Sequence, residues 1–122
     1  MHITDCRQGR YGRVMDGSLL AEVLHPERAG MPAFGCSIAR AIVREGEATL
    51  PHRLRKSAEV YYILAGAGIM HLGSASAAVR ADMLVYIPPG TVQWIENTGT
   101  GDLVFLCIVD PSWQPADEEL IG

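Results

Sequence analysis

Glycine and proline recur at short intervals along this chain and divide it into short runs rich in Val, Ile, Leu and Tyr. These residues favour half-buried strands, and the glycines and prolines between them are typical of turns. Helical periodicity is weak, with at most a turn or two of helix at Ala116–Ile121. We expect strands at Leu19–Leu24, Cys36–Val43, Val60–Leu64, Gly68–Leu72, Met83–Ile87, Val92–Glu96 and Leu103–Val109. The pattern predicts an all-β protein, an antiparallel sandwich or barrel.

The length of 122 residues fits one domain covering residues 1–122, because no repeat, linker or low-complexity segment divides the chain. The stretch Met1–Asp16 is polar and contains glycine, so we expect an arm that packs on a neighbour or stays mobile. The net charge is -4 and the basic residues are scattered, which argues against binding to nucleic acid.

Three widely spaced cysteines form neither a CxxC pair nor a disulfide framework, which indicates reduced thiols in a cytoplasmic protein. No apolar run is long enough to span a membrane, and the N-terminus lacks the pattern of a secretory signal. We therefore expect a cytoplasmic location and no contact with a membrane.

Strand alternation places Glu59, Tyr61 and Ile63 on one face, and likewise Gln93, Ile95 and Asn97. If Glu59 points into a barrel, its carboxyl group needs a partner, since a buried unpaired charge is costly. His52 and Gln93 are suitable partners, and a cation would be another.

Two segments resemble the motifs of the cupin superfamily. Residues 46–66 match the first motif, G, five residues, HxH, four residues, E, six residues, G, through Gly46, His52, Glu59 and Gly66. Residues 82–97 are similar to the second motif, G, five residues, PxG, two residues, H, three residues, N. Its PxG is Pro88–Gly90, and Asn97 takes the final position. The resemblance implies a double-stranded β-helix, the jelly-roll barrel of cupins.

The departures from these motifs bear on metal binding. Metal-using cupins usually hold the ion with three histidines and a glutamate, but Leu54 stands at the second histidine position and Gln93 at the third. The remaining candidate ligands are His52, Glu59 and Gln93. This set has one histidine, whereas the facial triad of non-haem iron enzymes has two histidines and a carboxylate. The resemblance thus implies at most one weakly held divalent ion (Zn, Ni, Fe or Mn), and no organic cofactor is expected. Asp82 replaces the first glycine of the second motif, a turn position.

Leu54 would make one wall of the pocket apolar, with Tyr61 and Gln93 as further substrate-binding candidates. The first hypothesis for function is a small cupin that binds a small molecule, a sugar or a carboxylate metabolite, without redox chemistry. The second is a metal-dependent isomerase or dioxygenase that uses His52, Glu59 and Gln93, with His71 as the other histidine that could join them. The third is metal-free acid–base catalysis by Glu59, the catalytic candidate, with His52 or Tyr61 as partner. Whether the protein is an enzyme is left open.

Several other residues receive the simpler interpretation. The basic run Arg53, Arg55 and Lys56 is expected to be solvated, although an anionic substrate could use it at the barrel mouth. Trp94 alternates away from Gln93, and with Trp113 it could serve an interface or ordinary packing. His25 receives no role. The exposed edges of the sheets need to be covered, and pairing between two copies of the chain would cover them. The resemblance to cupins also implies a homodimer, so we expect one.

Overall fold

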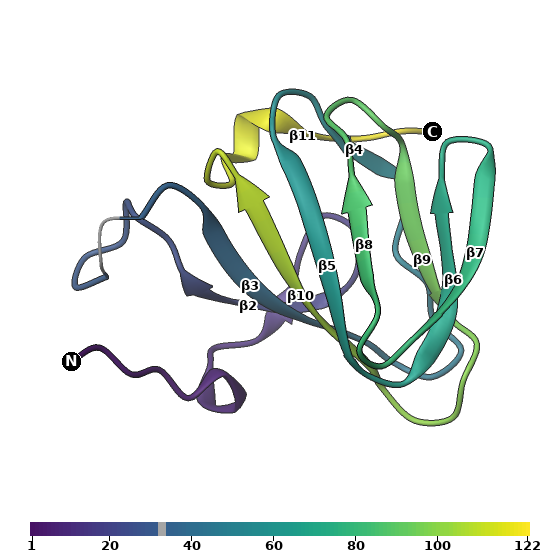
Figure 1. Ribbon diagram of the computed structural model, residues 1–122, viewed down its shortest axis with the longest axis horizontal. Helices are drawn as coiled ribbons and strands as arrows, with labels where there is room; N and C mark the ends of the chain where they lie inside the picture. The colour runs from purple at the N-terminus through teal and green to yellow at the C-terminus, as the bar shows by residue number, and fades with distance from the viewer. Residues whose placement is uncertain (32–33) are drawn as a thin grey trace.

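The computed structural model of the chain describes residues 1–31 and 34–122. In this part of the chain the strands form two antiparallel sheets that face each other, as expected for a jelly roll (Figure 1). In spatial order, the larger sheet contains β1 (Gly12–Arg13), β2 (Leu19–Leu24), β3 (Ser37–Val43), β10 (Leu103–Asp110), β5 (Ala58–Ala65) and β8 (Leu84–Ile87). The smaller sheet contains β11 (Glu118–Leu120), β4 (His52–Leu54), β9 (Gln93–Asn97), β6 (Ala67–Leu72) and β7 (Ala75–Arg80). The all-β prediction is confirmed.

The seven expected strands are all present, with ends that differ by at most two residues. Four short strands were not expected: β1, β4, β7 and β11. The expected helical turn at Ala116–Ile121 is largely wrong, because the 3-10 turn η2 covers Pro115–Asp117 and β11 follows it. Pairing of Glu118–Leu120 with β4 gives this backbone its hydrogen bonds, and tertiary contacts of this kind override weak local preference.

Two turns of the barrel depend on left-handed backbone conformation. Gly66 joins β5 to β6 with φ of 88°, and a side chain there would meet the backbone of Asp102 and Leu103. Asp82, at the turn position where the second motif has glycine, has φ of 68°. Aspartate tolerates this left-handed region better than most residues, so the turn survives the replacement.

The core fills one end of the barrel. Its buried residues are Ala41, Val43, Tyr61, Ile63, Met70, Val79, Ile87, Ile95, Leu103, Phe105 and Cys107. Alternation is confirmed: Glu59, Tyr61 and Ile63 are buried while the residues between them are more exposed, and Gln93, Ile95 and Asn97 are buried on β9. Among the described residues, no helix is long and apolar enough to cross a bilayer.

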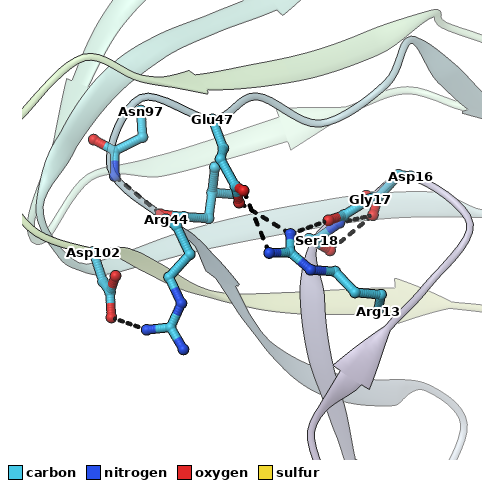
Figure 2. Close-up of polar contacts among 9 residues, drawn as sticks. Arg13, Asp16, Gly17, Ser18, Arg44, Glu47, Asn97 and Asp102 are labelled. Atoms are coloured by element: carbon cyan, nitrogen blue, oxygen red, sulfur yellow. Dashed lines mark hydrogen bonds and ion pairs between the residues drawn. The ribbon is translucent and has the colours of Figure 1, made fainter.

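Part of the N-terminal segment pairs with the chain's own sheet. Strand β1 pairs with the edge of β2, and the 3-10 turn η1 (Cys6–Gln8) precedes it. The Tyr11 hydroxyl donates to the Cys6 carbonyl and accepts from Arg40 of β3. Arg13 donates to the Gly17 carbonyl and to Glu47, in the loop that follows β3 (Figure 2). Paired backbone and these side-chain contacts attach residues 11–13 to the larger sheet, and the packing of the arm on a neighbour stays a prediction.

Figure 2 also shows how the loops at this end of β3 are held. Asn97, the final residue of the second motif, is buried and donates from Nδ2 to the carbonyls of Val43 and Gly101. Arg44 pairs with Asp102 at 2.8 Å. The motif asparagine therefore serves the fold, because it joins the ends of β3, β9 and β10.

Candidate functional site

A cavity of about 1020 Å³ adjoins the apolar core, and Tyr61 and Cys107 belong to both. Its wall comes from the inner face of the larger sheet, from β4 and β11 of the smaller sheet, and from two flanking segments. The lining residues are Arg10, Gly12, Arg13, Val14, Met15, Asp16, Leu20, Glu22, Arg28, Ala29, Met31, Ser37, Ala39, His52, Glu59, Tyr61, Cys107, Val109, Trp113 and Glu118. Apolar walls with a few converging polar groups are typical of small-molecule sites.

Glu59 is the central acidic group of this cavity. Strand β5 carries it inward, and it is 7% exposed. The Gln93 side chain on β9 of the opposite sheet donates from Nε2 to Glu59 Oε1 at 2.9 Å, so this bond joins the two sheets. Burial raises the pKa of Glu59 to about 8, the Gln93 bond lowers it, and the nearby Glu118 and Asp16 raise it further. At neutral pH the carboxyl group therefore keeps its proton most of the time.

His52 is held in one orientation by the backbone. Its ring is buried, and Nδ1 donates to the Leu50 carbonyl at 2.7 Å, because a carbonyl can only accept. Nε2 is therefore the lone-pair nitrogen of the neutral ring, and it lies 3.7 Å from Asp16 Oδ2. This distance is too long for a hydrogen bond and leaves both atoms available to a third group.

Asp16 is a site residue that the sequence reasoning missed. Its Oδ1 accepts from both the backbone N–H of Ser18 at 3.0 Å and the Ser18 hydroxyl at 2.7 Å, and the side chain is buried (Figure 2). Asp-Gly-Ser is a common turn signal in which the first side chain bonds the backbone two residues on. That signal could have indicated an ordered turn, and hence a place for Asp16 in the fold.

The C-terminal segment supplies two further residues, Trp113 and Glu118. Trp113 Nε1 donates to Glu118 Oε1 at 2.8 Å, and its backbone N–H donates to Ser37 Oγ. His25 is buried and accepts from the Glu27 N–H through Nδ1, so Nε2 donates to the Trp113 carbonyl at 2.8 Å. His25 thus has a positioning role that was not expected, and Trp113 lines the cavity.

The substrate-binding candidates lie at different depths. Tyr61 lines the cavity and packs on Phe105 with ring centroids 4.5 Å apart. Burial raises the pKa of Tyr61 well above its usual value, so the phenol stays neutral. Gln93 is fully buried behind Glu59, and Leu54 is buried on β4, and neither lines the cavity. Tyr61 is therefore the candidate of the three that a ligand can reach directly.

Arginines line the cavity, but they are not those of the basic run. Arg10, Arg13 and Arg28 line it, and all three are exposed, so they mark its mouth. Arg53 instead pairs with Glu119, and Arg55 donates to the Ala116 carbonyl. The alternative use of this basic run at the mouth does not fit the placement, because the Arg53 and Arg55 side chains hold the C-terminal segment.

The described donors do not fit a tightly bound metal ion. Among residues 1–31 and 34–122, no group of three His, Cys, Asp or Glu side chains is arranged to hold one. Gln93 directs its amide nitrogen, not its oxygen, to Glu59, and its Oε1 is buried with no partner among the described residues. His71 cannot join them, because it stacks on Trp94 on the outer face of the smaller sheet and bonds Glu96. His52, Glu59 and Gln93 therefore do not form a complete set of metal ligands.

Comparison with known proteins agrees with this architecture. The family model described as "Cupin domain" matches residues 39–109. The chain belongs to the cupin family. This cupin is 40% identical over 106 residues to an uncharacterised protein of Methanocaldococcus jannaschii, a match that covers 87% of this chain and 83% of that protein. It is 32% identical over 71 residues to an oxalate-binding protein of Thermotoga maritima, which covers 58% of this chain and 59% of the relative.

Solved cupin structures resemble the whole barrel. A predicted oxalate decarboxylase of Thermotoga maritima superposes with a TM-score of 0.79 at 25% identity, covering 90% of this chain and 99% of that one. The Streptomyces nucleoside dehydratase Pac13 superposes with a TM-score of 0.75 at 18% identity, covering 99% and 91%. At that identity the likeness to Pac13 shows the shared fold alone.

Proposed function

We propose that this cupin binds a small molecule, a sugar or a carboxylate metabolite, in the barrel cavity, with at most weak binding of a divalent metal. The observation that carries the proposal is the cavity itself, about 1020 Å³ with Glu59, His52 and Asp16 converging on its inner end. Its volume is close to the upper end of the range usual for small-molecule sites. The oxalate-binding relative supports a small organic ligand, without naming the one that this chain takes.

Metal-free acid–base catalysis is a second candidate, favoured by two titratable groups that line one cavity. Burial raises the pKa of Glu59 to about 8, so its carboxyl group keeps a proton at neutral pH, and the Nε2 of His52 accepts no hydrogen bond from the described residues. A proton donor and a proton acceptor in one cavity can act on the same bound molecule. The observation supports proton transfer as a reaction type but names no substrate.

The first experiment is a thermal-shift screen of common metabolites against chelator-treated protein. A ligand at a hundred times its dissociation constant stabilises the fold by about 2.7 kcal/mol, which is well within detection. Ala39→Phe should abolish every shift, because Ala39 lines the cavity. Ala77→Phe is the matched control, at an exposed position on β7. Shifts that persist in Ala39→Phe would place binding outside the cavity and contradict the proposal.

Metal content and turnover separate the candidates. Elemental analysis of protein purified without chelators should find substoichiometric metal in both the wild type and His52→Ala. Near-stoichiometric metal that disappears in His52→Ala would instead support the metal-dependent isomerase or dioxygenase. If the hit ligands are turned over, acid–base catalysis predicts activity that survives EDTA and is lost in Glu59→Gln.

The assembly and location of the protein are separate proposals. We propose a cytoplasmic homodimer, on the grounds of three unpaired cysteines and of sheet edges, β1 and β8 among them, that need covering. Light scattering at micromolar concentration should give twice the chain mass. A monomer would contradict the dimer.

A further inference from the structure

The inner end of the cavity presents hydrogen-bond acceptors. In the neutral form of His52, Nε2 carries the lone pair, because Nδ1 donates to the Leu50 carbonyl. Asp16 uses Oδ1 for Ser18, and among the described residues Oδ2 receives no hydrogen bond. These two atoms lie 3.7 Å apart, and among the described residues neither receives a hydrogen bond. Neither is among the fully buried polar atoms without a partner, so both can be reached by a group in the cavity that donates a hydrogen bond.

Two more carboxyl groups add to the excess of hydrogen-bond acceptors over donors in the cavity. Glu59 accepts from Gln93 through Oε1, and Glu118 accepts from Trp113 through Oε1. In the described part of the chain, the second oxygen of each receives no hydrogen bond. The proton that burial keeps on Glu59 is a donor on this surface. A ligand hydroxyl suits such a surface, because it can donate to Asp16 or His52 and accept from Glu59.

The mouth of the cavity presents the opposite charge. Arg13 is held by Glu47 at 3.0 Å and by the Gly17 carbonyl, and Arg28 is held by Glu22 at 2.6 Å. Arg10 also lines the mouth, and among the described residues no carboxylate pairs with it. Its guanidinium is therefore available to an anionic group, whereas an anion at the inner end would meet the carboxylate of Asp16.

We propose that the cavity takes a small polyhydroxylated acid whose hydroxyl groups point inward to Asp16 and His52 and whose anionic group stays at the mouth beside Arg10. This inference rests on the proposed function and narrows its ligand class. It excludes oxalate as the preferred ligand, because the oxalate dianion carries no hydrogen-bond donor and would bring negative charge to acceptors. In this respect the chain differs from its oxalate-binding relative.

Three probes separate the two ends of the ligand. Gluconate carries hydroxyls and a carboxylate, sorbitol carries hydroxyls alone, and oxalate carries carboxylates alone. In titration calorimetry of the full chain, gluconate should bind about tenfold or more tightly than either of the others, the effect of one charge-assisted hydrogen bond. Arg10→Gln should reduce gluconate to the affinity of sorbitol. Asp16→Asn should weaken gluconate and sorbitol alike.

The matched control is Arg7→Gln, since Arg7 is exposed in η1 and does not line the cavity. It has the same charge change as Arg10→Gln and should bind gluconate like the wild type. Oxalate binding as tightly as gluconate, or equal effects of Arg10→Gln and Arg7→Gln, would overturn the inference and leave cavity binding intact. Absence of binding by all three probes would also overturn it. The metabolite screen with Ala39→Phe then decides separately whether the proposed function fails.

Discussion

The two ends of this barrel are built from the same strands and are opposite in character. On β5, Ile63 belongs to the closed end and Glu59 to the open end; on β10, Phe105 and Val109 stand opposite them. At the closed end the inward side chains are apolar and meet across the barrel, with Ile63, Ile95 and Leu103 fully buried. Four residues along β5, the same inward alternation delivers a carboxyl group to a cavity.

The difference teaches that stability and ligand chemistry occupy separate parts of one fold. The closed end excludes water and stabilises the barrel by burying apolar area. The open end carries buried groups that disfavour folding, such as Glu59 and the unpartnered Oε1 of Gln93. Functional sites commonly reduce the stability of the fold in this way. Variants at the two ends can show whether the destabilising groups lie at the open end.

The largest effect should come from truncation at the closed end. Phe105→Ala removes a ring that is 1% exposed and packs on Tyr61, so it should lower the free energy of unfolding by about 3–5 kcal/mol. Val109→Ala, four residues along the same strand and on the cavity wall, should cost less, about 1 kcal/mol, because it enlarges a space that is already open. Urea unfolding measures both. Equal losses would show that the two ends are not distinct.

The pH dependence of the free energy of unfolding should show that buried Glu59, at the open end, destabilises the fold when it loses its proton. The pKa of Glu59 is about 8 in the fold and 4.5 as its ordinary value, so between these limits the folded chain holds a proton that the unfolded chain has lost. Stability then falls as pH rises, by about 1.4 kcal/mol per pH unit, and levels off above pH 8.

Glu59→Gln should remove this fall, because the amide does not titrate. Between pH 5 and 8, the free energy of unfolding of the variant should rise relative to that of the wild type by a few kcal/mol, as measured by urea unfolding across that range. The other carboxyl groups titrate in both proteins, so their contribution drops out of the difference between the two curves. Parallel curves would contradict the raised pKa and with it the acid–base candidate.

A smaller effect should follow at the wall of the cavity. Trp113→Phe keeps an aromatic ring at this position but removes the indole N–H that donates to Glu118 Oε1. The loss of this hydrogen bond should cost about 1 kcal/mol of stability. Trp94→Phe is the matched control, because that ring stacks on His71 on the outer face.

Ligand titrations should change the fluorescence of the Trp94→Phe protein, in which Trp113 is the remaining tryptophan. An unchanged signal at saturation would place the ligand away from Trp113.

The smallest effect is expected at the surface of the open end. Arg13→Gln breaks an exposed ion pair with Glu47, which salt screens and which side-chain freedom weakens, so the urea midpoint should stay within error of the wild type (Figure 2). A clear loss of stability would show that the N-terminal segment is coupled to the core more strongly than its exposed contacts suggest.

The sequence predicted the closed end better than the open one. Alternation along β5 and β9 was enough to place Ile63 and Ile95 inside, since a period of two is local information. Strand β7 was missed because Ala-Ser-Ala-Ala has weak strand preference and owes its conformation to pairing with β6. Asp16 and Glu118 were missed because they come from distant segments with no shared spacing.

Part of the cavity wall lies outside residues 39–109, the segment that marks the chain as a cupin. Arg10, Asp16 and Arg28 precede that segment, and Trp113 and Glu118 follow it. The flanks are therefore separable parts for ligand choice. Exchanging them between cupins, with the central strands kept, should re-specify what the barrel holds without redesign of the barrel. Conversely, a fragment trimmed to residues 39–109 would keep Glu59 and His52 but lose the groups that select what reaches them.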